Sequence, residues 1–362
     1  MIMSEIYLVF VVFLFVLAVF DLMVGVSNDA VNFLNSAIGA KVAKFRTIII
    51  VAAVGVFMGA TMSNGMMEVA RNGVFHPAMF SLKELMFIFL AVMISDVILL
   101  DIFNNLGLPT STTVSLVFEL LGGTTAFVLL KLANDTTGLT VGDLMNTEKA
   151  LGMIMAIFVS VAIAFFFGIV LQYISRLVFT FTYKKNLKWK IGIFGGVATT
   201  AIFYFMLFKG IKSMSFVTPE IYEYIQNHTL AILGICFLAS TAIMQFLYFL
   251  KVNVFKILVL MGTFALAMAF AGNDLVNFIG VPLAGYSAYT DFAASGASDP
   301  STFMMSSLEG PAKSPMIFLV AAGAVMVFSL ATSKKAHNVI KTSVDLSRQS
   351  EGDEMFGSSK IA

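Results

Sequence analysis

The chain has 362 residues, a formal net charge of +1, 59% hydrophobic residues, 12% charged residues and a mean hydropathy of +0.93. A soluble domain carries about 25% charged residues, so this composition indicates an all-α polytopic membrane protein that requires a lipid bilayer. The small net charge gives no reason to expect a nucleic-acid partner, and no basic run resembles a nucleic-acid footprint. The single cysteine, Cys236, excludes an internal disulfide and a cysteine metal cluster.

Apolar segments of roughly 20 residues, long enough to cross a bilayer, follow one another along the chain. We expect about nine spans, with approximate bounds 6–40, 47–63, 85–103, 110–130, 150–175, 191–208, 229–250, 255–285 and 315–332. The first and eighth segments each contain a polar motif beside small residues, so we expect both to be interrupted helices. From residue 333 the chain turns polar, which indicates a cytoplasmic tail or linker.

The two polar motifs are nearly identical. Residues 28–33 read NDAVNF and residues 273–278 read NDLVNF, which agree at five of six positions. An ionisable residue at membrane depth is costly and is by default a functional hypothesis, and two matching copies indicate an internal repeat with one site between the halves. Carboxylate and amide oxygens suit a hard cation such as sodium.

Loop charges predict how the two motifs are oriented. The stretch from Arg176 to Lys190 contains five basic and no acidic residues, which places it in the cytoplasm. Alternation then puts the N-terminus outside and makes the first motif run from outside to inside and the second from inside to outside. This is inverted-topology symmetry, as found in secondary transporters.

A third element follows the third apolar segment. Pro109 stands where a helix can start, and Thr110, Ser111, Thr112 and Thr113 place hydroxyl groups beside the unpaired N–H groups of its first turn. Hydroxyl groups both donate and accept hydrogen bonds, so they suit an oxyanion whose protonation changes. An ordinary Ser/Thr helix cap is the alternative interpretation.

Together, the two Asn-Asp motifs and the Pro-Thr-Ser-Thr-Thr segment resemble the PiT family of inorganic phosphate transporters, whose signature reads approximately G-A-N-D-V-A-N-A-x-G in each half. The resemblance implies symport of inorganic phosphate with a cation, usually sodium, rather than enzymatic activity or a bound cofactor. It implies phosphate contacts from Ser111, Thr112, Thr113, Asn28 and Asn273. It implies sodium contacts from Asp29, Asn32, Asp274 and Asn277.

The chain departs from the family pattern after the second motif, where no second Pro-x-Ser-Thr-Thr segment is present. We therefore interpret it as an N-terminal portion of a longer transporter or a natural truncation. The expected divisions are a first transporter repeat at 1–175, a basic cytoplasmic loop with connecting spans at 176–254, the start of a second inverted repeat at 255–332, and the polar tail or linker at 333–362.

Alternative functions remain open at this stage. One is a sulfate or proton-coupled anion permease of the same family, and another is an integral-membrane enzyme acting on a lipid phosphate. A channel or non-transporting scaffold is a third. We expect a multi-pass protein of the cell inner membrane working by alternating access, and the sequence leaves open whether two copies form a homodimer.

Overall fold

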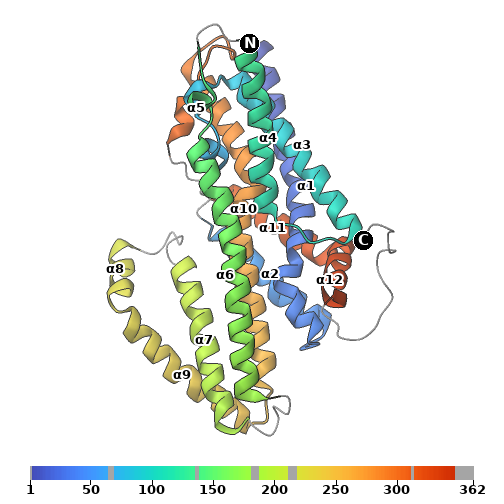
Figure 1. The fold of residues 1–362 in the computed structure, drawn as a ribbon, viewed down its shortest axis with the longest axis vertical. Helices are drawn as coiled ribbons and strands as arrows, with labels where there is room; N and C mark the ends of the chain where they lie inside the picture. The colour runs from blue at the N-terminus through green and yellow to red at the C-terminus, as the bar shows by residue number, and fades with distance from the viewer. Residues whose placement is uncertain are drawn as a thin grey trace.

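The computed structural model describes residues 2–63, 69–134, 138–180, 187–210, 218–310 and 314–346. Apart from two isolated bridges, the regular elements in these ranges are helices (Figure 1). In chain order they are α1 (Ile2–Gly39), α2 (Phe45–Thr61), η1 (Val69–Gly73), η2 (Pro77–Met79), α3 (Leu82–Leu106), α4 (Thr112–Ala133), α5 (Val141–Leu144), α6 (Thr147–Phe179), α7 (Lys188–Gly210), α8 (Pro219–Asn227), α9 (Thr229–Phe249), α10 (Val254–Ser295), η5 (Ser306–Glu309), α11 (Met316–Thr332) and α12 (Lys334–Leu346).

The prediction of an all-α polytopic membrane protein is confirmed. Within the described ranges, seven helices are long and apolar enough to cross a membrane, or eight if α11 and α12 form one broken span. Each of the nine apolar segments expected from the sequence coincides with one helix, apart from one or two residues at some ends, but α2 and α11 have only 17 residues each. A helix of that length reaches about 26 Å at 1.5 Å per residue, slightly less than the hydrocarbon thickness of about 30 Å.

One large core holds the bundle together. It is formed by α1, α2, α3, α4, α10, α11 and α12. Helix α2 approaches α10 closely because Gly55 and Gly59 face it, and a Cβ at Gly59 would lie 2.0 Å from the Met268 carbonyl oxygen. A second, smaller core joins α7 and α9 to the start of α10, at the lower end of the view in Figure 1.

The prediction of interrupted helices at the two motifs is wrong. Helix α1 is continuous through Asn28, and α10 is continuous through Asn273 even though it contains Pro282. The motif side chains find partners on neighbouring helices, so the backbone keeps its own helical hydrogen bonds. The small residue Gly25 instead permits close packing, because a Cβ there would lie 2.1 Å from the Phe278 ring.

Helices α1 and α10 pack against each other and run in opposite directions (Figure 1). The contacts between these two helices are equivalent for the two motifs. Gly25, three residues before the first motif, touches Phe278, the last residue of the second. Phe270, three residues before the second motif, lies 6.2 Å from Phe33, the last residue of the first, measured between ring centroids. The residues that precede each motif therefore pack against the last residue of the other motif.

A non-helical segment separates α3 from α4, close to the first motif. Gly107 has a φ of +69°, a left-handed conformation that ends α3, and the Leu108 N–H donates to the Phe103 carbonyl oxygen at 2.9 Å. Pro109 prevents the helix from continuing, and Ser111 caps α4 by accepting from the Val114 N–H at 3.3 Å. The hydroxyl-rich start of α4 therefore lies beside the first motif, with Thr112 buried and with Ser111 and Thr113 exposed.

Helices α11 and α12 meet at an angle of 66°. Helix α12, from the segment expected to be a polar tail or linker, packs against α1 and α3 and buries Ala336, Val339 and Ile340. Lys335 forms an ion pair with Asp101 of α3 at 2.5 Å. Residues 347–362 of the expected tail lie outside the described residues.

Candidate functional site

The amide of Asn28 connects three backbone segments. Its Nδ2 donates to Asn104 Oδ1 at 2.8 Å and to the Leu108 carbonyl oxygen at 3.1 Å, and its Oδ1 accepts from the Thr110 N–H at 2.8 Å. Asn104 in turn donates to the Val24 carbonyl oxygen at 2.7 Å. Asn28 is fully buried, so these bonds hold the α3–α4 break against α1.

The start of α4 contacts both motifs. Thr112 Oγ1 donates to Asp29 Oδ2 at 3.5 Å, and Thr113 Oγ1 donates to Asp274 Oδ1 at 3.3 Å. Asn277 Nδ2 completes the arrangement by donating to Thr113 Oγ1 at 2.9 Å and to Asp274 Oδ1 at 3.2 Å. Two adjacent threonines therefore bridge the carboxylates of α1 and α10.

The predicted site residues differ in how deeply they are buried. Asn28, Asp29, Thr112 and Asn277 are buried, and Asp274 is half-buried beside them. Ser111 and Thr113 are exposed at the start of α4, and Ser111 is occupied as the helix cap. By contrast, Asn32 and Asn273 are exposed.

A cavity of about 500 Å³ lies beside the first motif on the side where α1 ends. Asn32, Asn35, Ser36 and Pro109 are among its lining residues, together with Ser343 of α12. Asn35 Nδ2 donates to Ser343 Oγ at 2.8 Å, so α12 forms part of the wall. The exposed amide of Asn32 therefore faces a polar vestibule rather than the bridged carboxylates.

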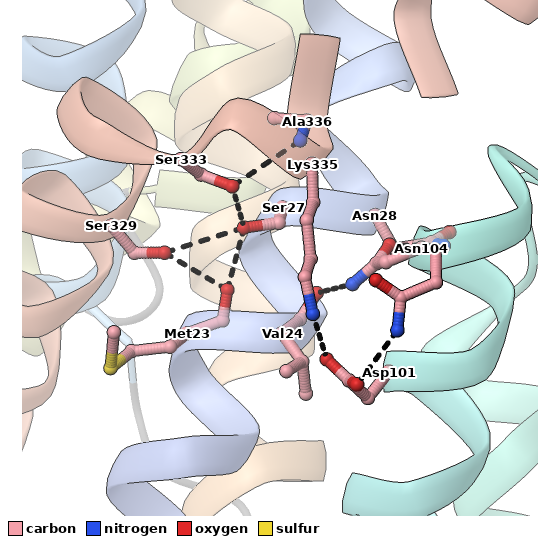
Figure 2. Close-up of polar contacts among 11 residues, drawn as sticks. Met23, Val24, Ser27, Asn28, Asp101, Asn104, Ser329, Ser333, Lys335 and Ala336 are labelled. Carbon is pink, nitrogen blue, oxygen red and sulfur yellow. Dashed lines mark hydrogen bonds and ion pairs between the residues drawn. The ribbon is translucent and has the colours of Figure 1, made fainter. Parts of the chain in front are cut away.

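A group of hydroxyl side chains lies next to Asn28, where α11 and α12 meet α1. Figure 2 shows Ser27 between Ser329 and Ser333. The Ser27 Oγ lies 2.7 Å from the Met23 carbonyl oxygen and 2.8 Å from the Ser333 Oγ, and Ser329 Oγ donates to the same Met23 oxygen at 2.9 Å. These bonds fix the bend between α11 and α12 against the first motif.

The electrostatics of the site suit an anion and a cation together. The N–H groups of Thr112 and Thr113 have no acceptor within α4, and the positive end of the helix dipole lies there. The carboxylates of Asp29 and Asp274 accept from the two hydroxyl groups and supply negative charge. An oxyanion fits the helix start, and a monovalent cation fits between that anion and the carboxylates.

Sequence reasoning missed two further acids near the site, Asp21 and Glu119. Asp21 is fully buried in α1, and Glu119 lies in α4 within contact of Ser115. The signal was present, because each is a carboxylate inside a long apolar segment. Neither belongs to a repeated motif, so motif comparison did not find them.

Comparison with known proteins identifies the family. The sequence pattern of the phosphate transporter family matches residues 25–343, a range that contains both motifs and the start of α4. The chain belongs to the phosphate transporter family. A solved structure described as the sodium-dependent phosphate transporter has a similar fold, with a TM-score of 0.65 and 19% sequence identity over 93% of this chain and 78% of that chain. No curated protein matches the chain.

Membership of this family agrees with the resemblance drawn from the motifs. It makes the chain a transporter rather than an enzyme acting on a lipid phosphate. The likeness to the solved structure concerns the fold, because the sequence identity is low.

Proposed function

We propose that this phosphate transporter family member carries inorganic phosphate across the membrane together with sodium, by alternating access to one site. The observation that carries the proposal is the bridge from Asp29 through Thr112 and Thr113 to Asp274. This bridge brings both Asn-Asp motifs to the start of one helix. A single site between the two halves is what an inverted-repeat transporter requires.

Phosphate would bind at the start of α4, to the N–H groups of Thr112 and Thr113. The hydroxyl groups of these residues, which donate to Asp29 and Asp274 here, would turn to the phosphate oxygens once sodium occupies the carboxylates. Sodium would bind to the carboxylates of Asp29 and Asp274 and to the amide oxygen of Asn277. None of the side chains in these contacts is positively charged, so sodium would balance the charge of phosphate. The solved protein of similar fold is described as sodium-dependent, which supports the same coupling ion here.

The reciprocal contacts of α1 and α10 support an inverted repeat, with a first half in residues 1–175 and a second half beginning at 255. In this arrangement the protein lies in the cell inner membrane, with its N-terminus on the side opposite the cytoplasm. The cavity beside Asn32 then opens toward the cytoplasm, because it lies at the end of α1 that is followed by Lys41 and Lys44. Alternating access would close this vestibule and open the opposite side.

Uptake of labelled phosphate into vesicles containing the purified chain tests the proposal. Sodium and choline gradients are compared, with unlabelled sulfate as competitor. We expect uptake that requires sodium and resists sulfate. Sodium should also raise the affinity for phosphate, and phosphate should raise the affinity for sodium by the same factor. Uptake that is equal in sodium and choline would disprove sodium coupling, and strong competition by sulfate would assign a different anion.

A further inference from the structure

Three carboxyl side chains meet inside the bundle between α1, α3 and α4. Asp21, Asp96 and Glu119 lie near enough for their charges to act on one another. Ser115 lies among them, with its Oγ 2.6 Å from Asp96 Oδ1 and 3.0 Å from Glu119 Oε1. Asp21 and Asp96 are fully buried. This group, called the carboxyl cluster below, is distinct from the bridge between Asp29 and Asp274.

The carboxyl cluster lacks the donors that ionised carboxylates need. Both carboxyl oxygens of Asp21, Oδ2 of Asp96 and Oε2 of Glu119 are buried and accept no hydrogen bond from any group in the described ranges. A buried polar atom without a partner costs about 1–3 kcal/mol, and more when it is charged. Neighbouring carboxylates also repel each other. The cluster therefore requires a positively charged species that no residue of the described ranges supplies.

The Ser115 hydroxyl identifies that species. A hydroxyl group has one proton to donate, yet Ser115 Oγ lies within hydrogen-bonding distance of both Asp96 and Glu119. It can bond to both carboxyl groups only if one of them is protonated and donates to it. A proton between Asp21 and Asp96 would likewise turn a repulsive contact into a hydrogen bond. Within the described part of the chain, no three His, Cys, Asp or Glu side chains are arranged to hold a metal ion.

The charged groups on the surrounding helices leave the carboxyl cluster uncompensated. On α3, Glu84 pairs with Lys131 of α4 and Asp101 pairs with Lys335 of α12. The buried Arg71 donates to the Ser287 hydroxyl of α10 and to the Ser307 carbonyl oxygen of η5. Exposed positions hold Arg46 of α2, Lys83 of α3 and Asp143 of α5, and Lys149 of α6 bonds to Asn72. Asp29 of α1, itself beside Asp274, is the further acid that acts on the cluster.

The carboxyl cluster is connected to the substrate site through two helices. Ser115 and Thr112 are three residues apart on α4, so they lie on neighbouring turns of one face. Asp21 and Asp29 are eight residues apart on α1, about 12 Å along its axis. A change of charge in the cluster therefore acts on the helices that position Asp29 and Thr112.

We propose that Asp21, Asp96 and Glu119, with Ser115, form a proton-binding site that holds at least one proton at neutral pH and links phosphate transport to pH. The proton binds reversibly to a carboxylate oxygen and is released to water. The link to transport rests on the proposed function, whereas the presence of the proton does not.

Infrared spectroscopy of the purified full chain tests the proton directly. A protonated carboxyl group has a C=O stretch separate from that of a carboxylate, and this band shifts in heavy water. We expect the band in the wild-type protein at neutral pH and its loss in Asp96→Asn and Glu119→Gln. Glu148→Gln, which changes an exposed acid at the start of α6, should keep the band. Ser115→Ala keeps all three acids, so the band should move rather than disappear.

The outcomes separate the proton from a metal ion and from misfolding. A wild-type protein without the band, or a band that persists in both cluster variants, would overturn the proposal. Loss of the wild-type band when sodium replaces choline would identify the cluster as a sodium site and would also overturn it. Gel filtration and thermal unfolding establish that each variant is folded, and Ser115→Ala provides a test that removes no acid.

A transport measurement tests the link to pH separately. Phosphate uptake by wild-type and Glu119→Gln protein is measured at saturating sodium over a series of pH values. Comparison at each pH cancels the titration of phosphate itself. The ratio of the two rates should change by up to about tenfold for each pH unit over which the site titrates, as binding of one proton requires. A constant ratio would disprove the link, and absence of wild-type uptake would disprove the proposed function while leaving the infrared result valid.

Discussion

The two Asn-Asp motifs have nearly the same sequence but opposite patterns of burial. In the first motif Asn28 is 0% exposed and Asp29 4% exposed, while Asn32 faces a cavity. In the second motif Asn273 is exposed, and Asn277 is 7% exposed and bonds to Thr113. The leading asparagine is therefore the buried one in α1, and the trailing asparagine is the buried one in α10.

This difference arises because both motifs meet a single partner, the start of α4. Helices α1 and α10 run in opposite directions, so the same residue pattern meets the start of α4 in opposite chain directions (Figure 1). The first motif uses its leading asparagine to hold the α3–α4 break, and the second uses its trailing asparagine to contact the threonines. A repeated sequence thus contributes two complementary halves of one site rather than two equal sites.

The largest expected effect is on sodium-dependent phosphate uptake when Asp29 or Asp274 is changed. Asp29→Asn and Asp274→Asn each remove a charge that the site would use to hold sodium, while keeping the shape of the side chain. Hydrogen bonds to charged groups contribute about 1.5–3 kcal/mol, so sodium-dependent phosphate uptake should fall about 10- to 100-fold. Asp29→Asn should have the larger effect because Asp29 is more buried.

Asp101→Asn is the matched control for these two changes. It removes a carboxylate of a partly exposed ion pair, whose contribution is about 0–1 kcal/mol. Uptake rates should therefore stay near wild type. Equal uptake by Asp29→Asn and wild-type protein would refute the role of the bridged carboxylates.

The next effect is on the free energy of unfolding when the leading asparagine of each motif, Asn28 or Asn273, is changed. Asn28→Ala removes the partner of Asn104, the Leu108 carbonyl oxygen and the Thr110 N–H. We expect a loss of about 2–3 kcal/mol in the free energy of unfolding, because buried groups are left unpaired. Asn273→Ala, at an exposed position, should change it by less than about 0.5 kcal/mol. Thermal unfolding in detergent checks both values, and equal shifts would contradict the asymmetry.

A third test uses the close contact between the motifs. A Cβ at Gly25 would lie 2.1 Å from the Phe278 ring, so Gly25→Ala should destabilise the protein by about 1–3 kcal/mol through overpacking. Gly280→Ala is the control, because its Cβ would meet its nearest neighbour at an ordinary distance of 3.5 Å. Helical propensity alone would make both changes slightly favourable. A stabilising Gly25→Ala, measured by thermal unfolding, would show that the two helices do not pack this closely.

Much of the fold could be predicted from the sequence, because length and hydropathy alone identify membrane helices. The break at Gly107 and Pro109 was also readable, since glycine and proline restrict the backbone locally. The continuity of α1 and α10 could not be predicted, because it depends on partners such as Asn104 and Thr113 that come from elsewhere in the chain.

Most residues of the site could be predicted from the motifs, but the different role of the same position in each motif could not. Motif reasoning selected Asn28, Asp29, Thr112, Asp274 and Asn277, which the fold brings together. It also selected Asn32 and Asn273, which lie outside the bridge. Which asparagine faces inward depends on the angle at which two antiparallel helices meet a third, and that angle is set by packing far from the motif.

The smallest expected effect compares the trailing asparagines. Asn277→Ala removes hydrogen bonds of 2.9 Å to Thr113 and 3.2 Å to Asp274, so both groups become freer to move. A net contribution of about 1–1.5 kcal/mol corresponds to about a tenfold increase in the KM for sodium. Asn32→Ala should raise this KM by no more than about twofold, because the side chain faces the cavity and not the bridge. Uptake measured over a sodium series checks both values. An effect of Asn32→Ala as large as that of Asn277→Ala would mean that the two motifs act as equal halves, and the division of labour between them would have to be abandoned.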